Sequence, residues 1–210
     1  MKKICNKLKN FCWKFFRKKV NKRLRKELTN PNVSIISNNC TGGIISHDLG
    51  LRFLSPTVNL FMEANDFVKL CENLEYYLGV TQIEEVIDTT RNYPVGKLED
   101  ITLYFVHYKT FEEAREKWLE RRKRVDLNNI RIFGCDRDGM TEQLMDRFER
   151  LPYSKVLFTH LPIDKSYAYY IKGYEEEKEV GLVLDGIGWK GKRVIDQFNY
   201  VRFLNEGKYD

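Results

Sequence analysis

The chain has 210 residues, of which 36 are Lys or Arg and 30 are Asp or Glu, giving a formal net charge of +6 at pH 7. A chain of this length suits one domain with a full hydrophobic core. The five cysteines include no CxxC pair, which argues against a disulfide framework or a structural zinc site and favours a reducing cytoplasm.

The positive charge is concentrated at the N-terminus. The first 26 residues contain twelve Lys or Arg and no Asp or Glu, which leaves 24 basic and all 30 acidic residues in the rest of the chain. The same segment has apolar residues at spacings of three and four, which form one stripe on a helix. This stripe comprises Ile4, Leu8, Phe11, Cys12 and Phe15, and it continues with a drift through Phe16, Val20, Leu24 and Leu28.

Aromatic residues on one face and cations on the others favour a helix that lies in a membrane interface. Two alternatives remain open: a solvated helix packed on its own domain, or an arm that binds nucleic acid. The nucleic-acid alternative is disfavoured. The segment lacks the apolar region of a secretory signal, and no window is apolar enough to span a bilayer.

We therefore divide the chain into a basic amphipathic helix with its linker, residues 1–30, and an α/β domain, residues 31–210, because Pro31 stops a helix. The expected partner of residues 1–28 is an anionic membrane surface. The expected location is cytoplasmic, peripheral to the inner face of the cell membrane.

Strands and helices alternate in the body. Strands are predicted over 33–37, 84–87, 101–106, 130–133 and 155–159, and helices over 44–49, 66–78, 110–124, 141–151 and 192–205. Residues 167–180 are ambiguous. The alternation favours a mostly parallel sheet with helices on both faces.

Polar residues follow four of these strands. Asn38, Asn39 and Cys40 follow the first, His107 the strand over 101–106, Asp136 and Arg137 the strand over 130–133, and His160 the last. Because ligand crevices of open α/β sheets lie at the carboxyl ends of the strands, these residues are expected to share one site. Further candidates are His47, Ser55, Thr57 and Asn59. The alternative is that loops after strands are polar without a common purpose.

Cys40 lies in a turn before a predicted helix, where a thiol pKa is lowered and a nucleophilic thiolate is favoured. His107 or His160 would then act as the base. The alternative is a small buried hydrophobic residue.

Gly42 and Gly43 in the same turn could bind phosphate through backbone amides, or could simply permit a tight turn. Asp136 and Asp138 would suit Mg²⁺ or Mn²⁺, although a solvated turn explains them equally well. We therefore predict no metal site and leave the cofactor open.

The segment Ser34-Ile35-Ile36-Ser37-Asn38-Asn39-Cys40-Thr41-Gly42-Gly43, followed by residues 47–51 and 53–60, resembles the bacterial DUF1919 family, whose members are often labelled exopolysaccharide or capsule biosynthesis proteins. The resemblance continues over most of residues 33–205. A more distant similarity is to the DUF1796 family of proposed papain-like cysteine peptidases, which implies Cys40 as nucleophile and His107 as base.

The leading hypothesis is a membrane-associated protein of exopolysaccharide or capsule biosynthesis, acting as a glycosyl- or acyltransferase on a glycan or a lipid-linked sugar precursor. The first alternative is a papain-like cysteine hydrolase or acyltransferase that uses Cys40. The second is a non-catalytic accessory protein of a polysaccharide synthase complex.

Overall fold

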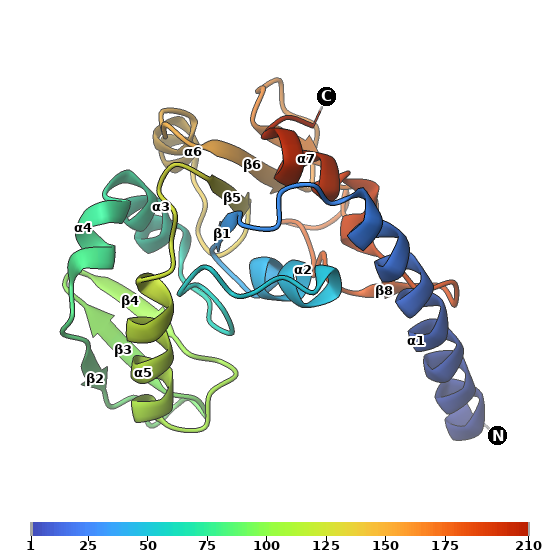
Figure 1. The fold of residues 1–210 in the computed structure, drawn as a ribbon, viewed down its shortest axis with the longest axis horizontal. Coiled ribbons are helices and arrows are strands. Elements are labelled where there is room, and N and C mark those ends of the chain that lie inside the picture. The colour runs from blue at the N-terminus through green and yellow to red at the C-terminus, as the bar shows by residue number, and fades with distance from the viewer. Residues whose placement is uncertain (1, 210) are drawn as a thin grey trace.

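The structure is a computed structural model that describes residues 2–209, with side chains described from residue 11 onward. Its central element is a four-stranded parallel sheet in the order β1-β5-β6-β7 (Figure 1). The strands are β1 (Ser34–Ser37), β5 (Ile130–Cys135), β6 (Ser154–Thr159) and β7 (Ala168–Tyr170). The predicted parallel sheet flanked by helices is confirmed.

Alternate side chains of the strands point into two separate hydrophobic cores. On one face, Ile36, Ile132 and Leu157 join a core that is covered by helices α3 (Ala64–Glu72), α4 (Leu74–Gly79), α5 (Phe111–Arg122) and α6 (Glu142–Glu149). On the other face, Ile35, Phe133 and Phe158 join a core covered by α1 (Lys2–Glu27), α2 (Thr41–Leu49), the short 3₁₀ helix η1 (Val194–Gln197) and α7 (Tyr200–Glu206).

The strand predicted over 101–106 belongs to a different sheet. Strand β4 (Ile101–Tyr104) pairs with β3 (Val95–Leu98), which pairs with β2 (Glu84–Val86), and all of these pairings are antiparallel. The turn between β3 and β4 is Glu99-Asp100, with Glu99 at a φ of 53°. This turn contains no glycine, so the usual sequence sign of a tight hairpin is missing. The prediction that His107 follows a strand of the parallel sheet was therefore wrong.

The closing helix predicted over 192–205 is also wrong in its first half. Residues Lys192–Arg193 form strand β9, which pairs with β8 (Gly186–Ile187) in a small antiparallel hairpin. Helix α7 begins later because the side chain of Asn199 accepts a hydrogen bond from the amide of Arg202 and caps the helix. The apolar residues were correctly recognised, but the chain reaches them through three short elements.

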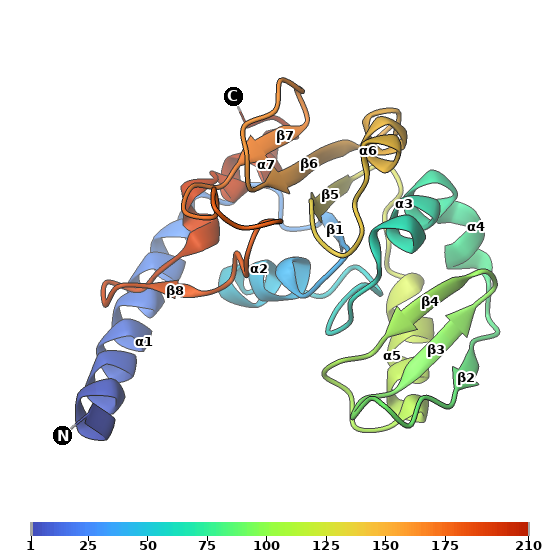
Figure 2. The same ribbon diagram turned by 180° about the vertical axis from the view of Figure 1, so that it is seen from behind.

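Helix α1 contacts the body through its C-terminal half and projects from it at its N-terminal end (Figures 1 and 2). Its docking face consists of Arg17, Asn21 and Leu24, which are buried. The apolar stripe predicted on this helix turns around the helix axis, so its two ends have different surroundings. Leu24 lies in the second core, with Val20 and Leu28 packed against it, whereas Phe11 and Phe15 are 71% and 51% exposed.

Candidate functional site

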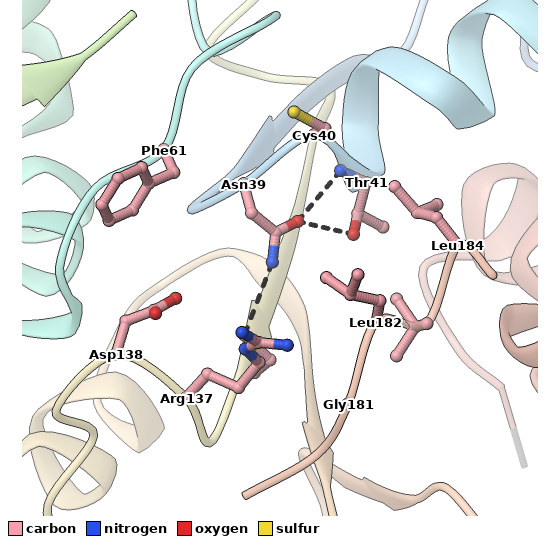
Figure 3. Close-up of a pocket in the computed structure, with 11 residues that line it drawn as sticks. Asn39, Cys40, Thr41, Phe61, Arg137, Asp138, Gly181, Leu182 and Leu184 are labelled. Atoms are coloured by element: carbon pink, nitrogen blue, oxygen red, sulfur yellow. Dashed lines mark hydrogen bonds between the residues drawn. The ribbon is translucent and has the colours of Figure 1, made fainter. Parts of the chain in front are cut away.

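A pocket of about 290 Å³ lies at the carboxyl ends of β1 and β5 (Figure 3). The chain leaves β1 for α2 on one face of the sheet and leaves β5 for α6 on the other, so the two connections separate and open a crevice. The lining residues are Asn39, Cys40, Thr41, Phe61, Cys135, Arg137, Asp138 and residues 181–184. The predicted crevice therefore exists, but its lining differs in part from the predicted set.

Asn39 ties the two sides of the crevice together. Its side-chain Oδ1 accepts hydrogen bonds from the amide of Thr41 at 2.9 Å and from the Thr41 hydroxyl at 2.6 Å. Its Nδ2 donates to the sulfur of Cys135 at 3.5 Å. Asn39 thus bonds the first residue of α2, as Figure 3 shows, and also reaches Cys135 at the end of β5.

Gly42 is required by packing rather than by a phosphate. A Cβ at this position would lie 2.8 Å from the Ser37 Oγ and 2.9 Å from Ile35. The Gly42 amide already donates to the Ser37 Oγ at 3.1 Å, and the amide of Thr41 is bonded to Asn39. Gly43 is similarly close to Val58. The turn therefore satisfies the amides of Thr41 and Gly42 internally.

Neither cysteine of the pocket carries an activated thiol. Burial raises the pKa of the Cys40 thiol, whose Sγ lies 4.0 Å from the Leu60 carbonyl oxygen. Burial also raises the pKa of Cys135 to about 11, although a hydrogen bond from Asn38 acts in the opposite direction. The predicted lowering of the Cys40 pKa is contradicted, because burial raises it.

Asp138 lines the pocket, although the sequence suggested it only as a possible metal ligand and not as a member of the predicted site. Its φ is 58° and that of the following Gly139 is 85°, so two left-handed residues turn the chain sharply after β5. Asp tolerates this conformation better than most residues. The turn is held by the Asp138 carbonyl, which accepts from the amide of Ala64 at 3.0 Å, and it leaves the carboxylate in the pocket lining.

The surroundings of Asp138 shift the pKa of its carboxyl. Burial raises its pKa above the ordinary range, the nearby Arg137 lowers it, and the carboxylates of Glu179 and Glu63 raise it further. A carboxyl with a raised pKa in a pocket makes Asp138 a candidate functional residue. The sequence sign that could have found it is the Asp-Gly pair directly after a buried strand.

Arg137 and Phe61 complete the polar and apolar sides of the pocket. The Arg137 guanidinium lies on the opposite side of the pocket from Cys40 and forms a half-exposed ion pair with Glu179 at 3.7 Å. Phe61 stacks on Tyr104 with ring centroids 4.5 Å apart. The pocket can thus hold an anionic or hydroxyl-rich group against one aromatic surface.

Asp136 and His160, both predicted as catalytic, are brought together beside the pocket but are not among its lining residues. One carboxylate oxygen of Asp136 accepts from the backbone amide and the ring Nδ1 of His160, at 2.8 and 2.6 Å. The other accepts from the amide of Val180 at 2.7 Å. Asp136 therefore fixes the chain directly before residues 181–184, which form the pocket wall.

The remaining predicted site residues have other places. Thr57 is buried, and its Oγ1 accepts from the amide of Ser37 at 3.1 Å and bonds Ser55 at 2.9 Å, so this pair supports the end of β1. His47 is exposed at the opposite end of α2. His107 is exposed after β4, where its amide donates to the carbonyl of Asn59 at 3.3 Å. These two histidines do not line the pocket.

Among residues 2–209, the structure brings no three His, Cys, Asp or Glu side chains together in a way that could hold a metal ion. In the same part of the chain, no helix combines the length and the apolar character that a membrane span requires.

Comparison with known proteins agrees with the early resemblance. The family model described as "Domain of unknown function (DUF1919)" matches residues 11–205. A protein of Haemophilus influenzae (strain ATCC 51907 / DSM 11121 / KW20 / Rd), named only "Uncharacterized protein", is 44% identical over 189 residues, which cover 89% of this chain and 90% of the relative. The residues matched by the family model include the pocket and most of α1. The chain therefore belongs to the DUF1919 family.

Proposed function

We propose that this protein is a transferase of exopolysaccharide or capsule biosynthesis that acts at a membrane surface on a sugar or a lipid-linked sugar precursor. The observation that carries the proposal is the pocket containing Asp138, a carboxylate whose pKa is raised by burial, beside Arg137. A volume of about 290 Å³ is at the lower end of ligand sites, so the pocket suits one sugar or phosphate-sized group rather than a long chain.

The proposed chemistry is displacement at the carbon of an activated sugar. Asp138 accepts the proton of an acceptor hydroxyl, whose oxygen forms the new bond to the sugar carbon while the bond from that carbon to the leaving phosphate oxygen breaks. Arg137 neutralises the phosphate as it leaves, exchanging its half-exposed contact with Glu179 for the ligand. Asn39, held by Thr41 and Cys135, orients the polar groups of the sugar.

The membrane part of the proposal is supported by the basic helix α1. Phe11 and Phe15 are exposed on the side of the helix away from its docking residue Arg17. Exposed aromatic residues among cations favour binding to anionic lipid. Deleting all of α1 would remove buried Arg17 and Leu24, so the cleaner test replaces exposed Lys14, Lys18 and Lys19 with Gln. The proposed location follows: cytoplasmic, at the inner face of the cell membrane.

The test of the chemistry is complementation of a deletion strain, with surface polysaccharide as the readout. Asp138→Asn keeps the shape of the side chain and tolerates the left-handed backbone, but it cannot accept the proton. We expect polysaccharide to fall at least about 100-fold, the usual contribution of a general base. The matched control is Asp164→Asn, which removes an exposed carboxylate elsewhere. Normal polysaccharide with Asp138→Asn at equal protein level would refute the transferase.

A non-catalytic accessory role is the second candidate, and one observation favours it. Several polar residues of the predicted site, such as Thr57 and Asp136, form hydrogen bonds with other groups of the protein. An accessory protein would tolerate Asp138→Asn, Arg137→Ala and Asn39→Ala, yet still require α1. The thiol hydrolase is disfavoured, because burial raises the pKa of the Cys40 thiol, and we expect Cys40→Ser to retain function.

A further inference from the structure

The hairpin of β8 and β9 crosses α1, and its turn reaches the far side of the helix (Figures 1 and 2). The indole Nε1 of Trp13 donates to the carbonyl of Lys192 at 3.1 Å. Gly191, at a φ of 73°, lies so close that a Cβ there would meet the backbone nitrogen of Arg17 at 2.3 Å. The hairpin is therefore packed directly against the backbone of the helix.

The tip of the hairpin, residues 187–190, continues the aromatic surface of the helix. Phe15 contacts Phe16 edge to face, and Phe16 contacts Trp189 in the same way, with ring centroids 5.7 Å apart in each pair. Trp189 is 54% exposed and Ile187 is 45% exposed. Large apolar side chains from two segments far apart in the sequence thus form one exposed surface, which soluble surfaces seldom carry without a partner.

Cations surround this surface. The Lys19 ammonium lies 4.6 Å from the ring centroid of Phe15, and the Lys190 ammonium lies 5.7 Å from that of Trp189. The first 26 residues of the chain carry no acidic residue. Interfacial aromatics beside lysines match the boundary of an anionic bilayer, where the rings enter the headgroup layer and the ammonium groups meet phosphates.

We propose that the hairpin tip is a second membrane anchor, with Trp189 and Ile187 inserted beside Phe11 and Phe15 into a bilayer that contains anionic lipid. Nucleic acid fits this surface less well, because Ile187 and the outer aromatic residues of a helix offer burial rather than a groove along a phosphate backbone. The inference adds a second element to residues 1–28 and does not depend on the chemistry of the pocket.

The anchor also bears on the orientation of the pocket. Residues 181–184 form the pocket wall and run directly into β8, whose next residues are the tip. The carbonyl of Leu184 accepts from the Arg193 guanidinium at 2.7 Å, which holds the base of the hairpin to the wall. A membrane-bound tip therefore places the pocket wall a few residues from the lipid surface, as a lipid-linked substrate would require.

The test is sedimentation of the full-length protein with vesicles of phosphatidylcholine alone or with 30% phosphatidylglycerol, a composition chosen for charge. Trp189→Ala should lower the partition coefficient on anionic vesicles about fivefold to tenfold, since burial of an aromatic side chain is lost. The matched control is Tyr76→Ala, because Tyr76 is 57% exposed on α4, far from α1. Equal partitioning of Trp189→Ala and the wild type would overturn the proposal.

A second measurement separates insertion from any loss of folding. Brominated lipid should quench wild-type tryptophan fluorescence, and Trp189→Phe should abolish most of this quenching while keeping a normal thermal transition. Trp118 is buried and should not report on lipid, whereas Trp13 is half-buried on α1 itself, so the quenching is measured in a Trp13→Phe background. Unchanged quenching in Trp189→Phe, or binding to duplex DNA that outcompetes anionic vesicles, would overturn the proposal. Neither assay requires enzymatic activity, so a failed transferase would leave this result intact.

Discussion

Charged groups lie at both ends of α2, but the carboxylates at one end are paired with cations and the carboxylate at the other end is not fully paired. At the C-terminal end, Asp48 is buried against Arg17, 2.8 Å away, and Arg17 also pairs with Asp196 at 2.7 Å. At the N-terminal end, Asp138 lines a pocket, and Arg137, which lowers its pKa, is paired with Glu179. Matched charges hold α1 to the body, whereas the incompletely matched carboxylate is available for chemistry. The comparison separates residues that stabilise the fold from residues that could act on a ligand.

The largest expected effect is at the matched end. Replacing Arg17 with Met keeps the length of the side chain but leaves Asp48 and Asp196 buried with less compensation. We expect the free energy of unfolding, measured in urea, to fall by about 3 kcal/mol. The control Arg23→Met removes an exposed pair with Glu27 and should cost less than about 0.5 kcal/mol. Equal effects would mean that the Arg17 cluster does not anchor the helix.

The next effect is on the pH dependence of stability. Burial alone would raise the pKa of Asp48, but Arg17 and Arg193 outweigh it and hold the pKa below the ordinary value. An acid with a depressed folded-state pKa stabilises the protein above its unfolded pKa of about 4 and loses that contribution as the pH falls further. Denaturant midpoints between pH 7 and pH 3 should therefore drop less steeply in Asp48→Asn than in the wild type. The same pH dependence of the denaturant midpoint in both proteins would contradict the lowered pKa of Asp48.

A smaller effect of opposite sign is expected at the pocket. Burial raises the folded-state pKa of Asp138, so its ionised form costs stability at neutral pH. Asp138→Asn should therefore raise stability at pH 7 by up to about 1 kcal/mol, and the gain should vanish below pH 4, where both states are protonated. A calorimetric scan of both proteins at the two pH values checks this. Destabilisation at pH 7 would show that the carboxylate is structural.

The smallest expected effect is a rate difference at the thiol beside the pocket. Since burial raises the pKa of Cys40, maleimide labelling of the folded protein at pH 7 should be slower there than for glutathione, and should accelerate as the pH rises. Cys71 is buried in the first core and should be slower still. Mass spectrometry of labelled peptides gives both rates. Labelling of Cys40 faster than glutathione would restore the activated-thiol hypothesis.

The sequence by itself determined the elements whose information is local. The buried run of β1 and the helices predicted over 110–124 and 141–151 were readable, because propensity and capping act over a few residues. Thr110 and Thr141 cap these two helices in the structure. The alternation of β and α elements sufficed for the parallel sheet. The crevice was also expected, since the carboxyl ends of parallel strands must meet at one edge.

Only the tertiary structure decided which strands share the sheet and which side chains reach the pocket. The sequence of β4 resembles that of any buried strand. It pairs with β3 through a hairpin turn that contains no glycine and so was not recognised. His107 was therefore assigned to the wrong sheet. Cys40 and Asp138 line the pocket together with residues 181–184, which are more than 40 positions away in the chain. Burial and strand pairing depend on contacts between residues that are far apart in the chain. A local sequence pattern shows only one of the two residues in each contact.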